Sequence, residues 1–541
     1  MFVHTAERSH DRVHVTPARN ATFAPLAIAA ITFVTHLAVV AFGPYGPHRD
    51  ALLYYAMGEH LRLFGMDFPP FIAIVARVFT VFGNIELLTH VPIAAAHGAL
   101  IVFTAMFARR SGGGRGVQAL AALCIATAPV FLRTGSLFQP VVFDQLWWTA
   151  ALWVLALIPE SPDSRRRWLA LGVVLGLGLL TKFTILVLGA AILLALLGTR
   201  ERRVLATPWP WAAGAVALLV GSPSIIGQAV LGWPFLQQYR DLAGVQLVHV
   251  SPASFIGEQF LMTGPILLMA GAAALGMLWS RGGHTWPASR GQERGLRLVI
   301  LTSVLAFLLM LLARGKPYYI APIWPAVIGI GLGHIDERLR AMSPEDAHRM
   351  SAGHRATLAL LWFLVAAWGA VALPLGLPIL PPGQMSRYAD WLGMGTTTNT
   401  GEVIALPQDY ADMLGWEDQV AAVEAAWASL SPEERERTVI LATNYGRAGA
   451  IDWFGSEELP DAIAPIGSYW FWGAGELPGE ITIVLGEEAS ELEGRYFRIA
   501  REFTRVPRTW GVPEERDVPV TIARDPLVPL HAVWPQFEGI N

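Results

Sequence analysis

Eleven apolar segments occupy most of the first two thirds of this 541-residue chain. A helix needs about 20 predominantly apolar residues to cross a bilayer, and most of the segments approach that length. They are residues 21–42, 89–108, 117–133, 141–158, 167–181, 183–198, 209–230, 255–279, 297–313, 318–334 and 355–379. The pair 167–181 and 183–198 is short and could instead form a re-entrant hairpin. The sequence therefore predicts a mainly α-helical, polytopic membrane protein with about 11 transmembrane helices.

The positive charges of the chain predict its orientation in the membrane. Of the 28 Lys and Arg residues before residue 383, 20 fall in the N-terminal tail, 1–20, or in every second loop. Cytoplasmic loops carry an excess of Lys and Arg, so the tail and these loops are expected inside. The tail has no apolar signal-peptide core, and the first span is expected to remain as an anchor. An odd number of spans then places the C-terminus outside.

A change of charge marks a second part of the chain. Residues from 383 onward carry a net charge of −15, whereas the residues before carry +11. The Pro/Gly-rich run 378–383 at the boundary suits a linker. We predict a transmembrane domain at 21–382, with a long outer loop at 43–88, and a soluble extracytoplasmic domain at 383–541.

The soluble part has the pattern of a small α/β domain. Residues 417–430 have amphipathic helical spacing, and Ser431 to Glu434 fits a capping box. The remaining predicted elements are buried strands at 439–442 and 481–485, a loop at 444–449 and a helix at 448–454. Alternation of strands and helices predicts an α/β layer. Gly446 and Gly449 are interpreted as turn residues, and the aromatic run 469–472 as core or as a platform for a sugar.

Six ionisable residues lie in or beside the predicted outer loops. They are Asp50, Asp67, Asp144, Lys182, Glu258 and Lys316. Ionisable groups at a membrane are costly and usually functional. Lys182 and Lys316 are also the only lysines among 39 Lys and Arg residues. They are therefore candidates for positions that need a compact ammonium, although chance retention would give the same count.

Together, these groups suit a phosphate-bearing lipid and a hydroxyl-bearing acceptor. A carboxylate can bind a hydroxyl and remove its proton, although an Asp before a helix also serves as a cap. Cations beside Tyr318 or Tyr319 can hold a phosphate, although a lone cation can also reach toward the interface without binding anything. The gathering of both kinds of group at one membrane edge predicts a site for a lipid-phosphate substrate.

Several segments resemble bacterial family 39 glycosyltransferases of the GT-C superfamily, which are relatives of protein O-mannosyltransferases and of the lipid A aminoarabinose transferase. The segments are 48–70, 143–148, 177–182 and 316–325, and in the tail 407–413, 443–452 and 468–473. Their order and spacing together carry the likeness. It implies a GT-C fold and an inverting transfer of a sugar from a polyprenyl-phosphate donor to a protein, lipid or glycan acceptor. It also implies the outer face of the bacterial cytoplasmic (inner) membrane.

The resemblance implies roles for individual residues. Asp50 matches the catalytic acid of the family, Asp67 and Asp144 match further acids, and residues 316–319 match its basic-Pro-Tyr-Tyr element. The predicted site comprises Asp50, Asp144 and Asp67 as catalytic residues, Lys316, Lys182, Tyr319, Tyr318, Arg314 and Arg49 at the donor phosphate, and Glu258, Gln259 and His48 on the acceptor side. The family often has a second acid after the first, where this chain has Ala51. No metal or other cofactor is therefore expected to be required.

Two other functions fit a polytopic chain. A transporter or flippase of lipid-linked saccharides would also meet such substrates, but its polar groups usually lie near the midplane of repeated halves. A receptor whose acidic domain binds a partner would leave the clustered carboxylates and lysines unexplained. The chain shows no nucleic-acid motif, and its single cysteine, Cys124, allows no Cys-based metal site.

Overall fold

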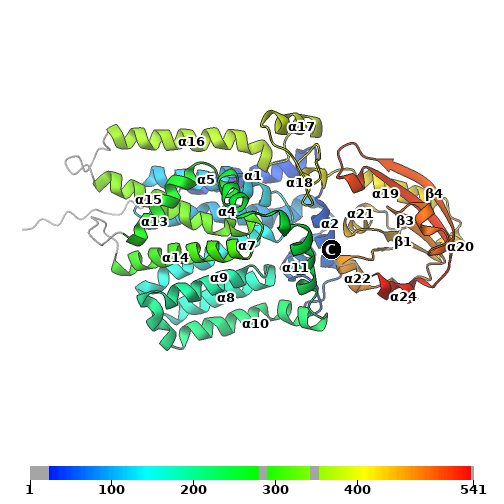
Figure 1. Ribbon diagram of the computed structural model, residues 1–541, viewed down its shortest axis with the longest axis horizontal. Helices are drawn as coiled ribbons and strands as arrows, with labels where there is room; N and C mark the ends of the chain where they lie inside the picture. The colour runs from blue at the N-terminus through cyan, green and yellow to red at the C-terminus, as the bar shows by residue number, and fades with distance from the viewer. Residues whose placement is uncertain (1–22, 280–288, 342–351, 538–541) are drawn as a thin grey trace, which may run out of the picture.

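The computed structural model describes residues 23–279, 289–341 and 352–537. Long, roughly parallel helices form a bundle, and a domain with a β-sheet packs on one end of it (Figure 1). The predicted N-terminal tail, 1–20, lies outside the described residues. The predicted fold class, mainly α with a small C-terminal α/β domain, is confirmed.

Each predicted apolar segment contains at least one helix. The helices are α1 (Phe23–Phe42), α4 (Glu86–Arg110), α5 (Arg115–Thr127), α6 (Pro129–Thr134), α7 (Val141–Leu157), α8 (Arg165–Thr181), α9 (Ile185–Leu197), α10 (Trp209–Val230), α12 (Pro252–Thr263), α13 (Ile266–Trp279), α14 (Arg290–Leu312), α15 (Trp324–Ala341) and α16 (Ala352–Gly376). Within the described ranges, six helical stretches are long and apolar enough to cross a membrane, or up to eight with two bent pairs. The chain is therefore an integral, multi-pass membrane protein.

The predicted span 255–279 is not one straight helix. The axes of α12 and α13 differ by 108°. The break falls at Gly264, whose φ of 92° ends α12, and Pro265 then prevents the helix from continuing. The number of straight spans is accordingly lower than the eleven predicted from hydropathy.

Loops predicted to share one side of the membrane lie together in the structure. Arg110 and Arg167 both pair with Glu160, the second at 3.7 Å. Arg294 pairs with Glu201 at 3.0 Å. These contacts join the ends of α4, α7, α8, α9 and α14. The soluble domain sits at the other end of the bundle (Figure 1).

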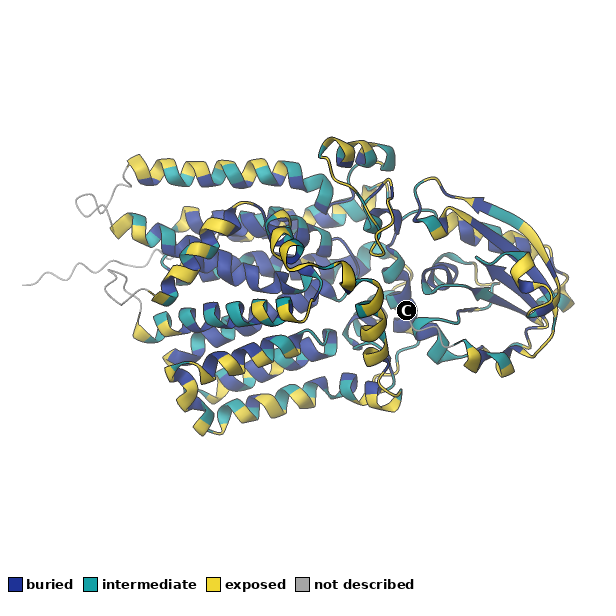
Figure 2. Ribbon diagram, viewed as in Figure 1, coloured by how far each residue is buried: buried dark blue, intermediate teal, exposed yellow. Residues whose placement is uncertain are grey.

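Two short helices connect α1 to α4 at the end that faces the soluble domain. They are α2 (Arg49–Glu59) and α3 (Phe71–Thr80), and both lie within the predicted outer loop, 43–88. Seven of the eleven residues of α2 are buried. A third short helix, α11 (Pro234–Val245), also lies at this junction, and most of it is exposed (Figure 2). Helix α2 is thus held between the bundle and the soluble domain.

The soluble domain is built on a five-stranded sheet of order β2-β1-β3-β5-β4. The strands are β1 (Thr438–Ala442), β2 (Ala462–Ile463), β3 (Ile481–Leu485), β4 (Phe497–Pro507) and β5 (Asp517–Pro526). Strands β1, β2 and β3 are parallel, and β5 and β4 are antiparallel to their neighbours. The helices of this part are α17 (Pro382–Trp391), α18 (Gln408–Ala411), α19 (Trp416–Ala428), α20 (Pro432–Arg435), α21 (Tyr445–Phe454), α22 (Gly467–Trp472), α23 (Ala489–Leu492) and α24 (Leu530–Val533).

The predicted β1, β3, α19 and the capping box at Ser431 are confirmed, but one loop prediction is wrong. Helix α21 begins at Tyr445, three residues before the predicted helix at 448–454, because the Asn444 side chain accepts a hydrogen bond from Arg447 N at 2.9 Å and caps it. Gly446 and Gly449 consequently lie inside a helix and not in a turn. Strands β2, β4 and β5 were not predicted.

Candidate active site

Asp50 lies in the first turn of α2, at the junction of the bundle and the soluble domain. It does not cap the helix, because His48 is the N-cap residue and its Nδ1 accepts a hydrogen bond from Asp50 N at 3.0 Å. The Asp50 carboxylate instead accepts two side-chain hydrogen bonds. Tyr445 donates to Oδ1 and Gln139 donates to Oδ2, each at 2.9 Å. The carboxylate is therefore held by groups from both domains.

The two lysines belong to one cluster of polar groups. The Lys182 ammonium lies 4.1 Å from the centroid of the Tyr319 ring and 5.2 Å from that of Tyr318. The two rings meet edge to face, with centroids 4.7 Å apart. Lys182 therefore does not extend from its hairpin into solvent, as a cation that only reaches for the interface would do.

A chain of electrostatic contacts links these lysines to the carboxylates. Lys182 interacts with Asp144 and with Lys316, and Lys316 interacts with Asp50. Burial lowers the pKa of Lys316, while the charges of Asp50 and Asp409 oppose that shift. Asp50, Lys316, Lys182 and Asp144 thus form a series in which the charge of each residue influences the next.

Asp144 lies in the first turn of α7 and is buried. The Thr184 hydroxyl, just before α9, lies 2.9 Å from both carboxylate oxygens. Asp144 therefore faces the α8–α9 hairpin, whose tip carries Lys182.

Asp67, in the loop between α2 and α3, is covered by the soluble domain. The Ser468 hydroxyl of α22 lies 2.8 Å from both oxygens of its carboxylate. Burial raises the pKa of Asp67 to about 6, and the hydrogen bond from Ser468 opposes the shift. Both aspartates of the first outer loop, Asp50 and Asp67, thus accept a hydrogen bond from a hydroxyl of the C-terminal domain.

His48 and Arg49 mainly contact the C-terminal part of the chain. The His48 Nε2 lies 3.9 Å from carboxylate oxygens of both Asp409 and Asp412. Arg49 pairs with Glu514 at 3.4 Å, and its backbone N donates to Asp412 O at 3.0 Å. These contacts anchor the start of α2.

Three predicted residues lie apart from this cluster or serve packing. Gln259 is buried, donates to Pro317 O at 3.0 Å and accepts from Trp324 Nε1 at 2.9 Å. Glu258 lies in the middle of α12 and not at its start. Arg314 is exposed and adopts a φ of 51° where α14 turns into the short 3₁₀ helix Pro317–Ile323.

The sequence interpretation missed four residues that contact the predicted carboxylates: Tyr445, Gln139, Thr184 and Ser468. Tyr445 and Ser468 fall in the tail segments 443–452 and 468–473, which carry the family resemblance, so that likeness was the available signal. In the described part of the chain, no group of three or more His, Cys, Asp or Glu side chains is arranged to hold a metal ion. Metal independence stays a prediction.

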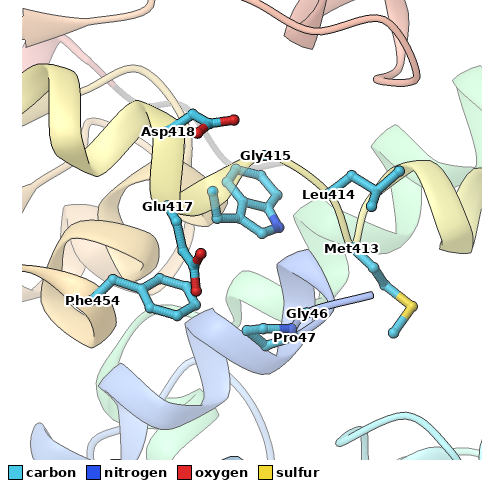
Figure 3. A pocket seen from close by; sticks show the side chains of 9 residues that line it. Gly46, Pro47, Met413, Leu414, Gly415, Glu417, Asp418 and Phe454 are labelled. Carbon is cyan, nitrogen blue, oxygen red and sulfur yellow. The ribbon is translucent and has the colours of Figure 1, made fainter. Parts of the chain in front are cut away.

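A pocket of about 170 Å³ lies beside the start of α2 (Figure 3). It is lined by Gly46, Pro47, residues 413–418 and Phe454. Gly46 N donates to Met413 O at 3.1 Å, so the pocket sits where the chain before α2 meets the segment before α19. It contains no residue of the predicted site.

The half-buried carboxyl of Asp452 predicts a pH effect on stability. In α21 it accepts hydrogen bonds from Tyr469 and from Ala462 N. Burial raises its pKa from 3.8 to about 7. Between these values the unfolded chain has lost the proton that the folded protein retains. The free energy of unfolding should therefore fall by roughly 1.4 kcal/mol per pH unit as the pH rises from about 4 to about 7.

Asp452→Asn should remove this contribution, because the amide does not titrate. Melting temperatures of the purified protein and the variant, measured from pH 4.5 to pH 8, test the prediction. The melting temperature of the variant should fall less steeply with rising pH. Parallel curves for the two proteins would contradict the assignment.

Comparisons with known proteins concern the sequence and the fold of the chain. Residues 67–226 match the family described as dolichyl-phosphate-mannose-protein mannosyltransferase. The structure is similar to ArnT from Cupriavidus metallidurans in the apo state, with a TM-score of 0.52 and 16% identity, covering 92% of this chain and 97% of that one. It is also similar to ArnT from the same organism bound to undecaprenyl phosphate, with a TM-score of 0.55, 15% identity and the same coverage of both chains. A search of curated proteins gave no significant match.

The matched family segment contains Asp67, Asp144 and Lys182, and the likeness to ArnT extends over both domains. The fold of both domains is therefore shared with a solved structure. The chain shares its fold with ArnT, and its residues 67–226 are similar to the mannosyltransferase family.

Proposed function

We propose that the protein is an inverting glycosyltransferase that moves a sugar from a polyprenyl-phosphate donor to an acceptor hydroxyl. The observation that carries the proposal is the cluster of Asp50, Lys316, Lys182 and Asp144 at the end of the bundle that meets the soluble domain. A base and two ammonium groups in one cluster would suit a substrate pair that carries a hydroxyl and a phosphate. ArnT, which shares the fold, has been solved with undecaprenyl phosphate, and the matched family is described by a dolichyl-phosphate sugar.

In the proposed reaction, Asp50 accepts the proton of the acceptor hydroxyl. The acceptor oxygen bonds to the anomeric carbon while the bond from that carbon to the phosphate oxygen breaks. The electron pair leaves with the polyprenyl phosphate, whose charge Lys182 and Lys316 stabilise. A lipid phosphate is already a fair leaving group, so the protein mainly supplies orientation and fixed charges.

The remaining residues have supporting parts in this proposal. Tyr318 and Tyr319 position Lys182 through contacts between its ammonium and their aromatic rings. Asp144 orients Lys182, and Asp67 shapes the acceptor side near the soluble domain. Arg49 and His48 act through their contacts with the C-terminal segment, and the predicted roles of Arg314, Glu258 and Gln259 have the least geometric support.

Turnover of lipid-linked sugars by the purified protein in lipid tests the proposal. Donors with labelled hexoses and pentoses are incubated with a Ser/Thr-rich peptide, a glycolipid or a cell-wall glycan. Release of polyprenyl phosphate together with labelled acceptor is the expected result. Movement of an intact donor across the bilayer without cleavage of the sugar–phosphate bond would instead establish the flippase alternative.

We further propose a location in the bacterial cytoplasmic membrane with the soluble domain outside. The single cysteine, Cys124, is buried, so new cysteines can be labelled selectively in a Cys124→Ala background. Exposed Arg498, in β4, and exposed Arg202, in a predicted inner loop, provide a matched pair. In intact spheroplasts an impermeant maleimide should label Arg498→Cys and should label Arg202→Cys only after lysis. The reverse pattern would overturn the orientation.

A further inference from the structure

The contact between Tyr445 and Asp50 is built by the packing of α21 on α2. A Cβ added at Gly449 would lie 2.7 Å from the main-chain carbonyl carbon of Leu52, and one added at Gly446 would collide with the Arg49 side chain. Only glycine lets the two helices approach so closely. The two glycines therefore set the distance at which the Tyr445 hydroxyl meets the carboxylate.

Tyr445 is also fixed by its own surroundings. It is the first residue of α21, directly after the cap Asn444, whose amide donates to Glu515 at 2.9 Å. The Arg49 guanidinium lies 5.3 Å from the centroid of its ring. Burial, together with the Asp50 charge, raises the pKa of Tyr445 far above its usual value, so the phenol keeps its proton and acts as the donor.

We propose that Tyr445 of the soluble domain is a positioning residue for Asp50, so that the C-terminal domain forms part of the reaction site. This inference rests on the proposed function of Asp50 as the base. With Tyr445 on Oδ1 and Gln139 on Oδ2, the plane of the carboxylate is set by one donor from each domain. The ionised form, which is the one that removes a proton, is the form these donors favour.

Tyr445→Phe tests the proposal, because it removes the hydroxyl and keeps the ring against Arg49. We expect kcat to fall by about tenfold or more, the scale of one hydrogen bond to a charged group, with little change in KM for the donor. The acidic limb of the pH profile of kcat should move to higher pH, because the ionised carboxylate loses a donor. A purely structural role would not move this limb.

The matched control is Tyr410→Phe. Tyr410 is buried, and its hydroxyl donates to Pro374 O at 2.9 Å, so it also joins the C-terminal part to the bundle without touching Asp50. Gel filtration and melting curves establish that both variants are folded. A Tyr445→Phe variant with the kcat and pH profile of the wild type would overturn the positioning role. Equal losses in the two variants, with an unmoved acidic limb, would also overturn it.

A second variant, Gly449→Ala, keeps the inference testable should Tyr445→Phe prove too unstable to assay. Gly449→Ala keeps the tyrosine side chain but pushes α21, which carries it, away from α2. The variant should therefore show the same shift of the acidic limb. An unmoved limb in Gly449→Ala would count against the proposal. Turnover by the wild type alone tests the proposed function, whereas the difference between wild type and Tyr445→Phe tests the positioning role. The two failures are therefore distinguishable.

Discussion

The Asp50→Asn variant is expected to lose about 10²-fold or more of its turnover, the range that a general base contributes. An amide keeps the shape of the side chain but cannot accept a proton. The surroundings tolerate the change, because the amide oxygen still accepts from Tyr445 and the Gln139 amide can turn its oxygen toward the new NH₂ group. Melting temperature and donor binding should therefore remain close to those of the wild type.

Asp390→Asn is a matched control for this change, since Asp390 is an exposed carboxylate of α17 outside the site. Its turnover should equal that of the wild type. Initial rates of polyprenyl-phosphate release at saturating donor compare the three proteins. Near wild-type turnover in Asp50→Asn would remove Asp50 from the chemistry and leave it as a contact between domains.

Lys182→Arg and Lys316→Arg should each weaken donor use, although both keep the positive charge. A guanidinium is larger than an ammonium and binds through a planar fork, so it fits poorly where a point charge must meet one phosphate oxygen. The expected cost is about 1–3 kcal/mol in kcat/KM, typical of one charged hydrogen bond. The larger loss is expected at Lys182, because its ammonium lies against the Tyr319 ring and feels the charge of Asp144.

Rates measured over a series of donor concentrations separate binding from the chemical step in both lysine variants. Arg62→Lys, at an exposed position of the outer loop 43–88, is the control for an exchange of cation type. Unchanged kinetics in both variants would mean that the two lysines persist by chance. The donor phosphate would then have to be held by another cation, with Arg49 the first to test.

The helical part of the structure was largely predictable, because an apolar segment of 17 to 25 residues has few alternatives to a helix in a membrane. The bend after Thr263 escaped prediction, although Gly264 and Pro265 mark it, because mean hydropathy averages over such breaks. In the soluble domain, β1 and β3 are continuous apolar runs and were found. Strand β4 is an edge strand with four charged residues and several exposed positions, so it lacks the continuous apolar run that marks β1 and β3.

Individual residues of the site were predictable from the sequence, but the contacts between them were not. The sequence indicated Asp50, Asp67 and the lysines through their cost in a membrane protein, which is a local property. Their hydrogen-bond partners were not indicated, because no local pattern tells which distant residue will meet a carboxylate. Gly446 and Gly449 illustrate the difficulty, since a glycine that opens a turn and a glycine that admits a neighbouring helix look the same in sequence.

The contact between Tyr445 and Asp50 joins residues 395 positions apart, and this separation has a consequence for biogenesis. At ribosomal rates of about 5–20 residues per second, roughly 20 to 80 s pass between synthesis of the carboxylate and synthesis of the tyrosine. In that interval the bundle is inserted into the membrane with α2 still lacking its partner helix. The nascent protein can therefore acquire membrane helices long before Tyr445 is available, and folding of the C-terminal domain becomes the step that completes the proposed site.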